Sequence, residues 1–132
     1  MWKSAIHEIE EYPLTGVDFG NYEAAYREKY MLDEAKERLQ GHAHNVYLQF
    51  WAETGLPGLI LFCGLFGYIL HWSWRRAKNF YALIIFSSTF GLMLYELTDY
   101  TFAGFSAMRV YWLLLGICLV GIKLTERKKF SV

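Results

Sequence analysis

The sequence has few of the features that mark a secreted or metal-stapled domain. It contains only two cysteines, Cys63 and Cys118, and both fall inside apolar runs. They give neither a disulfide framework nor a metal-ligand pattern, so both are expected to be small core residues. The first 30 residues hold six acidic side chains and no apolar stretch long enough for a secretory signal. We therefore expect no leader that would carry the N-terminal segment across a membrane.

Each half of the chain is poor in charge of one sign. Residues 1–55 carry ten acidic side chains against five Lys or Arg, whereas residues 56–132 carry three against eight. The net charge of zero thus hides an acidic half joined to a basic half. The overall content of 55% hydrophobic and 19% aromatic residues is also high for a soluble domain. These contrasts predict a polar segment over residues 1–55 and a membrane segment over residues 56–132.

The second segment contains three long apolar runs. Residues 56–72 and 80–95 carry no charge, and residues 103–122 carry only Arg109. At about 1.5 Å per residue each run covers roughly 24–30 Å, which is close to the hydrocarbon thickness of a bilayer. As buried helices of a soluble protein, the three runs would leave too little polar surface to cover them. The sequence therefore predicts an all-α, polytopic membrane protein fragment with three transmembrane helices.

The charges between the runs predict an orientation. Basic residues gather between the first two runs and after the third, and the positive-inside rule assigns both places to the cytoplasm. The connection 96–102 carries two acids and no base, so it should face outward together with the N-terminal segment. An outward N-terminal segment without a preceding span predicts that further transmembrane helices lie upstream, in the same chain or in a partner.

Short helices are predicted within the first segment. One should stop before Pro13, one should run over residues 21–41 from a cap at Asn21, and one over residues 45–54 should be closed by Gly55. The first should bury Trp2, Ile6 and Ile9, and the second carries a stripe of tyrosines at helical spacing. Residues 13–20, with one Pro and two Gly, are expected to form a loop.

Residues 42–58, with the sequence HAHNVYLQFWAETGLPG, form the densest cluster of functional residue types. Here the chain resembles the O-antigen ligase and O-antigen polymerase superfamily of bacterial membrane glycosyltransferases. The large periplasmic loop of that family ends in a similar His-Asn-x-Tyr-Leu, followed by Glu-x-Gly and Gly-Leu leading into a transmembrane helix. Residues 13–20 are similar to its Pro-Leu-x-Gly-x-Gly loop, with Asp18 where a Gly is commoner. The resemblance is strongest over residues 9–61 and would match the C-terminal third of a family member.

The resemblance implies an activity. Family members transfer a glycan from undecaprenyl diphosphate to a hydroxyl of lipid A core or of another glycan, at the periplasmic face of the inner membrane, without ATP, metal or other cofactor. This chain is therefore expected to be part of a metal-independent glycosyltransferase with a lipid-linked donor and a glycan acceptor as partners. One alternative is a truncated, non-catalytic fragment or an accessory subunit. A transporter segment would account only for the helices and Arg109.

The same resemblance implies roles for particular residues. His44 matches the His-Asn position and is expected to be the catalytic base, because a helix N-terminus disfavours imidazolium and keeps the ring able to accept a proton. Arg27 is the first candidate for the donor diphosphate, since a guanidinium pairs with phosphate in a fork. The further candidates for substrate binding are Arg38, Asn45, His42 and Arg109.

Each candidate also has an ordinary structural interpretation. His44 and Asn45 are suited to capping the following helix, and Arg27 to a solvated helix face. Glu53 would then sit in water at the end of its helix. Arg109 either pairs with Asp99 or Glu96 or contacts a lipid phosphate, because a charge inside a span requires a partner. No metal is expected, because the spacing of the two histidines and Glu53 is not a recognised zinc pattern.

Overall fold

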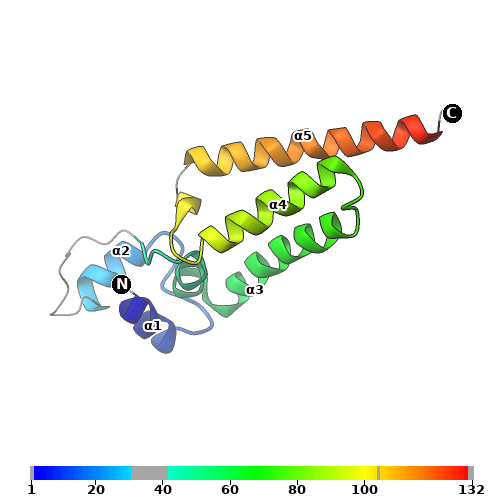
Figure 1. The fold of residues 1–132 in the computed structure, drawn as a ribbon. Coiled ribbons are helices and arrows are strands. Elements are labelled where there is room, and N and C mark those ends of the chain that lie inside the picture. The colour runs from blue at the N-terminus through cyan, green and yellow to red at the C-terminus, as the bar shows by residue number, and fades with distance from the viewer. Residues whose placement is uncertain (1, 31–41, 104, 131–132) are drawn as a thin grey trace. The chain divides into compact units, whose positions relative to one another are not determined.

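The computed structural model describes residues 2–30, 42–103 and 105–130 (Figure 1). Within these ranges all regular elements are helices. They are α1 (Trp2–Glu11), α2 (Tyr22–Ala25), the π-helical turn η1 (Tyr26–Tyr30), α3 (Val46–Trp74), α4 (Phe80–Tyr95), the 3₁₀ turn η2 (Thr101–Ala103) and α5 (Phe105–Phe130). The chain divides into an N-terminal unit, Met1–Gly64 with Tyr95–Tyr100, and a C-terminal unit, Leu65–Leu94 with Thr101–Val132.

Two helices are long and apolar enough to cross a membrane. They are α3 over Val46–Trp74 and the stretch Ser106–Arg127 of α5. The all-helical prediction is thus confirmed for the described residues, together with two of the helices of membrane length. The second apolar run coincides with α4, Phe80–Tyr95, which is shorter. Its passage through a membrane stays a prediction, as does the division at residue 55.

A glycine kink in α3 lies where the sequence predicts the end of a helix. Gly55 has φ 69° and ψ −176°, a left-handed conformation that glycine adopts without steric cost. The loop 13–20 packs onto this kink. The Leu56 amide donates to the Pro13 carbonyl at 2.9 Å, and the Val17 amide donates to the Ala52 carbonyl at 2.8 Å. The loop therefore supplies the partners that the interrupted helix lacks.

Close backbone contact explains why glycines stand in both segments. A Cβ on Gly16 would lie 2.3 Å from the Glu53 carbonyl oxygen, and one on Gly55 would lie 2.1 Å from the Leu14 carbonyl oxygen. Both glycines also have φ of 69°. Asp18 adopts φ 80°, and aspartate is among the few side chains that tolerate this region. Asp18 can therefore stand where the resembled loop prefers glycine.

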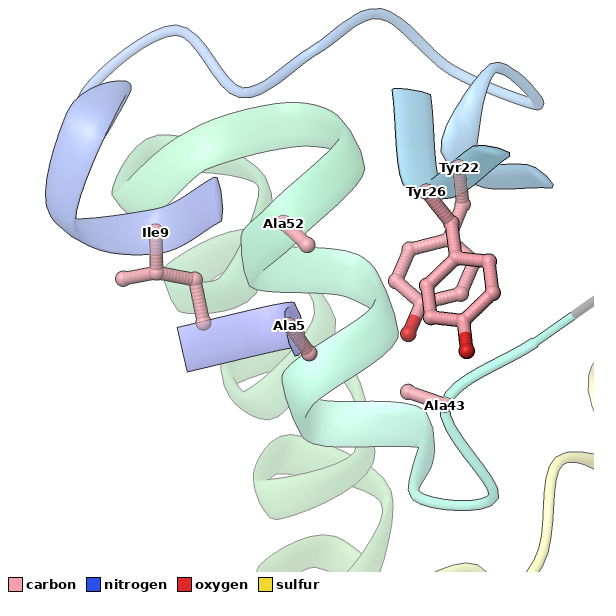
Figure 2. Packing of buried hydrophobic residues seen from close by; sticks show 6 residues of the cluster. All are labelled: Ala5, Ile9, Tyr22, Tyr26, Ala43 and Ala52. Atoms are coloured by element: carbon pink, nitrogen blue, oxygen red, sulfur yellow. The ribbon is translucent and has the colours of Figure 1, made fainter. Parts of the chain in front are cut away.

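The core of the N-terminal unit brings α1, the tyrosines of α2 and η1, and α3 together (Figure 2). The rings of Tyr22 and Tyr26 are stacked with centroids 6.3 Å apart, and both are buried. The predicted apolar stripe of α1 is wrong in part, because Trp2 and Ile6 are exposed and only Ile9 is buried. The face of α1 that turns inward is instead formed by Ser4, Ala5, Glu8 and Ile9.

Two further expectations need correction. Asn21 precedes α2, but its side chain makes no capping hydrogen bond, and its Nδ2 donates to the Val17 carbonyl at 3.1 Å.

Cys118 is buried as expected, whereas Cys63 is exposed. An apolar run on a single helix has more than one face, and the structure covers the face of Phe62 and Phe66 rather than that of Cys63.

The C-terminal unit is an apolar helical assembly. Ala82, Ile85, Cys118 and Ile122 form its buried cluster, against which the last turns of α3 also pack. Side-chain hydrogen bonds link α4 and the residue before it to α5. The hydroxyls of Thr89 and Tyr111 lie 2.9 Å apart, and Asn79 Nδ2 donates to Thr125 Oγ1 at 2.9 Å. Shape and apolar area therefore hold this unit together.

Candidate functional site

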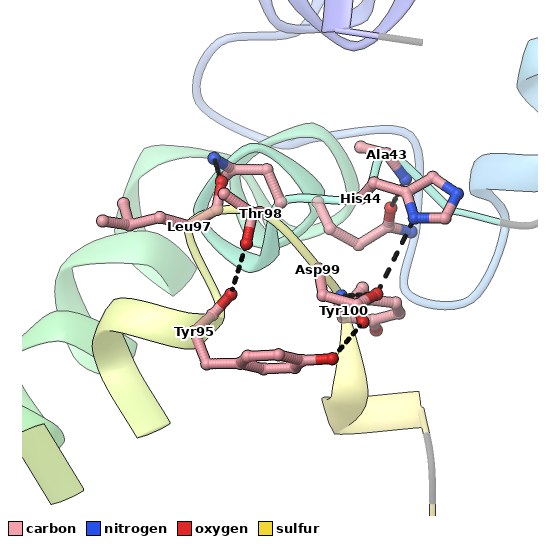
Figure 3. Close-up of polar contacts among 9 residues, drawn as sticks. Ala43, His44, Tyr95, Leu97, Thr98, Asp99 and Tyr100 are labelled. Carbon is pink, nitrogen blue, oxygen red and sulfur yellow. Dashed lines mark hydrogen bonds and ion pairs between the residues drawn. The ribbon is translucent and has the colours of Figure 1, made fainter. Parts of the chain in front are cut away.

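The candidate site, here called the histidine cluster, contains His42, His44, Tyr95, Asp99 and Tyr100. Figure 3 shows the last four with their polar contacts. His44 has φ 51° and lies directly before Asn45, at the start of α3. The side-chain oxygen of Asn45 accepts a hydrogen bond from the Leu48 amide at 3.0 Å. The predicted N-cap at Asn45 is confirmed, and it fixes the point at which the histidine-bearing segment turns into the helix.

Hydrogen bonds join the connection after α4 to the start of α3. The Val46 amide donates to the Glu96 carbonyl at 3.0 Å. The side-chain nitrogen of Asn45 donates to the Leu97 carbonyl at 2.9 Å. Asn45 thus uses both ends of its amide within the protein, so its contacts are structural. These bonds join residues that are 50 and 52 positions apart in the sequence, and they bring Asp99 next to His44.

Asp99 is held in a fixed orientation toward His44. His44 Nδ1 lies 3.7 Å from Asp99 Oδ1, which is within ion-pairing range. The Tyr95 hydroxyl donates to Asp99 Oδ2 and the Tyr100 amide donates to Oδ1, both at 2.8 Å. These hydrogen bonds, with the nearby imidazoles, hold the pKa of Asp99 below its usual range. An ionised Asp99 can stabilise the imidazolium that forms when His44 accepts a proton.

His42 packs against His44 instead of facing a charge. The two imidazole centroids are 4.1 Å apart in an edge-on arrangement, and the Tyr100 ring lies 5.7 Å from His42. Burial lowers the pKa of His42, and the neighbouring His44 lowers it further, while Asp99 acts in the opposite direction. Its Nδ1 is buried without a hydrogen-bond partner among the described residues. His42 is therefore kept neutral beside His44, whose side chain is 43% exposed.

The Gln49 side chain holds the backbone of the histidine segment by a hydrogen bond. The sequence did not predict this role. Its side-chain oxygen accepts from the Ala43 amide at 2.7 Å, and its side-chain nitrogen donates to Glu53 Oε1 at 2.8 Å. Gln49 and Glu53 are both buried, so the expectation that Glu53 sits in water is wrong. The two residues lie one helical turn apart, and together they tie the backbone between the histidines to the interior of the unit.

Glu8 adds a second buried carboxyl to this interior. It is fully buried, and neither of its carboxyl oxygens has a hydrogen-bond partner among the described residues. Burial raises its pKa to about 8, and the charge of Glu53 contributes to the shift. Burial likewise raises the pKa of Tyr22, with contributions from both carboxyls. Sequence reasoning missed Glu8 because it stands among other acids, which are exposed.

Arg27 makes none of these contacts. Arg27 is exposed on η1, and its charged partner is Glu23, at 4.0 Å. Arg38 lies outside the described residues. Arg109 belongs to α5 of the C-terminal unit, and its side chain is exposed there. Of the predicted site residues, the structure therefore brings together His42, His44 and Asn45. In the part of the chain that the structure describes, no three potential ligands gather as a metal site.

Comparison with known families bears on this unit. Residues 1–63 match the family model described as O-antigen ligase. The resemblance expected from the sequence is confirmed over this segment. The O-antigen ligase match covers just under half of the 132 residues and ends one residue before Gly64, where the main segment of the N-terminal unit ends. No curated protein and no solved structure matches the chain. The match indicates a role in O-antigen ligation or polymerisation and, with the two apolar helices, a location in a membrane.

Proposed function

We propose that the histidine cluster is the catalytic centre of a glycosyltransferase of O-antigen ligase type. The enzyme would transfer a glycan from undecaprenyl diphosphate to a hydroxyl of lipid A core or of another glycan. The observation that supports this most directly is the pairing of His44, which lies within the O-antigen ligase match, with an oriented Asp99. Nucleophile activation of this kind needs a base whose second nitrogen is held by another group.

The proposed step follows from the two nitrogens of His44. Nδ1 faces Asp99, which leaves Nε2 for the acceptor hydroxyl. His44 takes the hydroxyl proton while the acceptor oxygen forms a bond to the anomeric carbon of the donor. The bond between that carbon and the diphosphate oxygen breaks, and undecaprenyl diphosphate leaves with the electron pair. Asp99 stabilises the imidazolium in the meantime, and the proton then passes to water or to the departing diphosphate.

The departing diphosphate requires positive charge. Arg27 is the proposed partner among the described residues, and Arg38 is the second candidate. The pairing of Arg27 with Glu23 is an exposed contact at 4.0 Å, and such pairs are worth at most about 1 kcal/mol. A diphosphate with two or more charges can therefore compete for this guanidinium.

We place the N-terminal unit at the periplasmic face of the bacterial inner membrane and the C-terminus in the cytoplasm, on the basis of the charge pattern of the loops.

Glycan transfer in membranes that carry the protein in its native context tests this proposal. Lipid-linked glycan is supplied, and the product on lipid A core or glycan is measured for His44→Ala, Asp99→Asn, His42→Ala and His7→Ala. We expect His44→Ala to lower kcat by about 1,000-fold, within the range that loss of a general base produces. Asp99→Asn should lower kcat by less, with KM unchanged, because Asp99 acts through His44. His42→Ala should lower the transfer rate less than His44→Ala does.

The matched control is His7→Ala, which removes an exposed imidazole from α1 of the same unit. It should leave the rate unchanged. Membrane insertion of every variant is measured in parallel, so that loss of protein is not counted as loss of chemistry. Equal rates for His44→Ala and His7→Ala would exclude His44 from the reaction. They would favour the non-catalytic alternative for this chain.

A further inference from the structure

A concave surface lies in the N-terminal unit, between α2, η1 and the loop that follows α1. This tyrosine cleft has a volume of about 350 Å³, which falls within the range of roughly 300–1,000 Å³ typical of ligand sites. Five of its eight lining residues carry hydrogen-bonding side chains, and the other three are small and apolar. The five are Tyr12, Asn21, Glu28, Lys29 and Tyr30. None of them belongs to the histidine cluster.

The cleft is built by contacts that fix its walls. The Tyr30 hydroxyl donates to Glu11 Oε2 at 2.6 Å, and the Lys29 ammonium pairs with the other oxygen of Glu11. Lys29 Nζ lies 5.5 Å from the centroid of the Tyr30 ring and 6.0 Å from that of the Tyr12 ring. Asn21 donates to the Val17 carbonyl at 3.1 Å, which leaves its side-chain oxygen for other donors. A set of donors, acceptors and aromatic rings is thus held in place around an open space.

The charged groups at the cleft determine whether an anionic, apolar or neutral polar ligand fits it. Its one cation, among the described residues, is already paired with Glu11, and a second carboxylate, Glu28, lines the same space. An anion such as phosphate would therefore meet more negative than positive charge. A purely apolar ligand would leave the carboxylate and amide without partners, which costs free energy. A neutral molecule with many hydroxyl groups satisfies both the polar groups and the aromatic rings.

We propose that the tyrosine cleft binds the neutral saccharide portion of a glycan substrate. The inference rests on the proposed function for its substrate class, while the cleft itself is independent of the histidine cluster. Tyr12 supplies a ring that is 42% exposed, against which a sugar can pack. Glu28 and Asn21 accept hydrogen bonds from sugar hydroxyls. The cleft would thus hold a part of the glycan that does not react.

Saccharide binding and transfer kinetics together test the cleft. The full chain in detergent is titrated with a linear oligosaccharide of six glucose units and, separately, with inorganic pyrophosphate. We expect Tyr12→Ala and Glu28→Gln to weaken saccharide binding by about 5- to 10-fold, since the first removes the ring contact and the second replaces a charged hydrogen-bond acceptor with a weaker neutral one. In the transfer assay the same variants should raise the KM for one glycan substrate and leave kcat within about twofold. The substrate whose KM rises is the one that occupies the cleft.

Two controls match these variants. Phe19→Ala removes an aromatic ring that is 74% exposed on the same loop but does not line the cleft. Glu10→Gln removes an exposed carboxylate of α1. Equal weakening by Tyr12→Ala and Phe19→Ala, or pyrophosphate binding that depends on Glu28 and Tyr12, would overturn the proposal. Loss of transfer in His44→Ala with normal saccharide affinity in Tyr12→Ala would contradict saccharide binding at the cleft and leave the proposed function standing. Normal transfer in His44→Ala with weakened saccharide binding in Tyr12→Ala would sink only the proposed function.

Discussion

The two units treat buried polar groups differently. In the N-terminal unit, four described residues keep buried side-chain atoms without a hydrogen-bond partner: Ser4, Glu8, Tyr22 and His42. Across the described residues of the C-terminal unit there is no such atom. Buried Thr89 contacts Tyr111, and buried Ser73 donates to the Ile69 carbonyl at 2.7 Å. An unpaired buried polar group costs about 1–3 kcal/mol, so the N-terminal unit carries an unfavourable load that the C-terminal unit avoids.

This difference in buried, unpaired polar groups indicates which unit carries the local destabilisation. Polar groups that are buried and unpaired concentrate in the unit that contains the O-antigen ligase match and the histidine cluster. The helices of that unit are short except for α3. The glycine contact between loop 13–20 and α3 therefore adds to what its apolar core contributes. Such local conflict is expected at functional sites and is offset elsewhere in the structure.

The largest effect should come from breaking the glycine contact. In Gly16→Ala and Gly55→Ala the new methyl would lie within 2.3 Å of a carbonyl oxygen, at a backbone φ that alanine disfavours. We expect each to destabilise the N-terminal unit by about 2–4 kcal/mol. Hydrogen exchange at the Val17 and Leu56 amides, which bridge the two segments, measures this locally.

A control from the C-terminal unit sharpens the comparison. Gly116 lies in α5, and a Cβ there would meet nothing within 4 Å. Gly116→Ala should therefore be neutral or stabilising by up to about 1 kcal/mol through helix propensity. Within the N-terminal unit, the double variant at Gly16 and Gly55 should be less destabilising than the sum of the singles, because both break the same contact. Fully additive losses would contradict the mutual dependence of the two glycines.

The next largest effect should come from Glu8. Its pKa is raised to about 8 in the folded protein against an ordinary value near 4.5, so the folded state binds the proton more tightly than the unfolded state. The carboxyl therefore adds no ionisation penalty at pH 4, and destabilises the unit progressively as pH rises from about 4.5 to about 8. Glu8→Gln, which stays neutral, should stabilise the unit by about 2 kcal/mol at pH 8 and by little at pH 4.

The groups that face Glu8 are Glu53 of α3 and Tyr22 of α2, and both are unchanged in this variant. Denaturant unfolding at several pH values, followed by tryptophan fluorescence, measures the difference. Glu10→Gln on the exposed face of α1 serves as the control and should show no such pH dependence. A Glu8→Gln variant that is less stable than the parent protein at pH 8 would mean that the carboxylate has a favourable partner after all.

Local sequence signals predicted much of this fold. Gly55 followed by Pro57 marked the break in α3, and the uncharged run over residues 80–95 coincides with α4. Such features depend on backbone geometry and on the length of apolar runs, which are legible in the sequence. The buried face of α1 was mispredicted because Ser4 and Glu8 are polar, and hydrophobic periodicity cannot identify a polar residue that turns inward.

The candidate site was only partly predictable for a similar reason. His44 and Asn45 stand in a recognisable motif, and Asn45 caps its helix as expected. Asp99 lies 55 positions further along the sequence and was considered only as a partner for Arg109. It reaches His44 because two carbonyls of the connection after α4 accept bonds from Asn45 and Val46. Long-range hydrogen bonds of this kind leave no periodic trace in a sequence.

The smallest effect is expected inside the C-terminal unit, at its buried hydroxyl pair. Thr89 Oγ1 donates to the Ile85 carbonyl at 2.7 Å, so in the 2.9 Å contact the Tyr111 hydroxyl is the donor. Hydrogen bonds between apolar membrane helices average about 0.6 kcal/mol in double-mutant cycles. Tyr111→Phe and Thr89→Val should therefore show a coupling of about that size when unfolding is measured in detergent, with exposed Tyr68→Phe as the neutral control. If the coupling exceeded the loss caused by Gly16→Ala, polar pairing rather than apolar packing would hold this unit, and the contrast between the two units would fail.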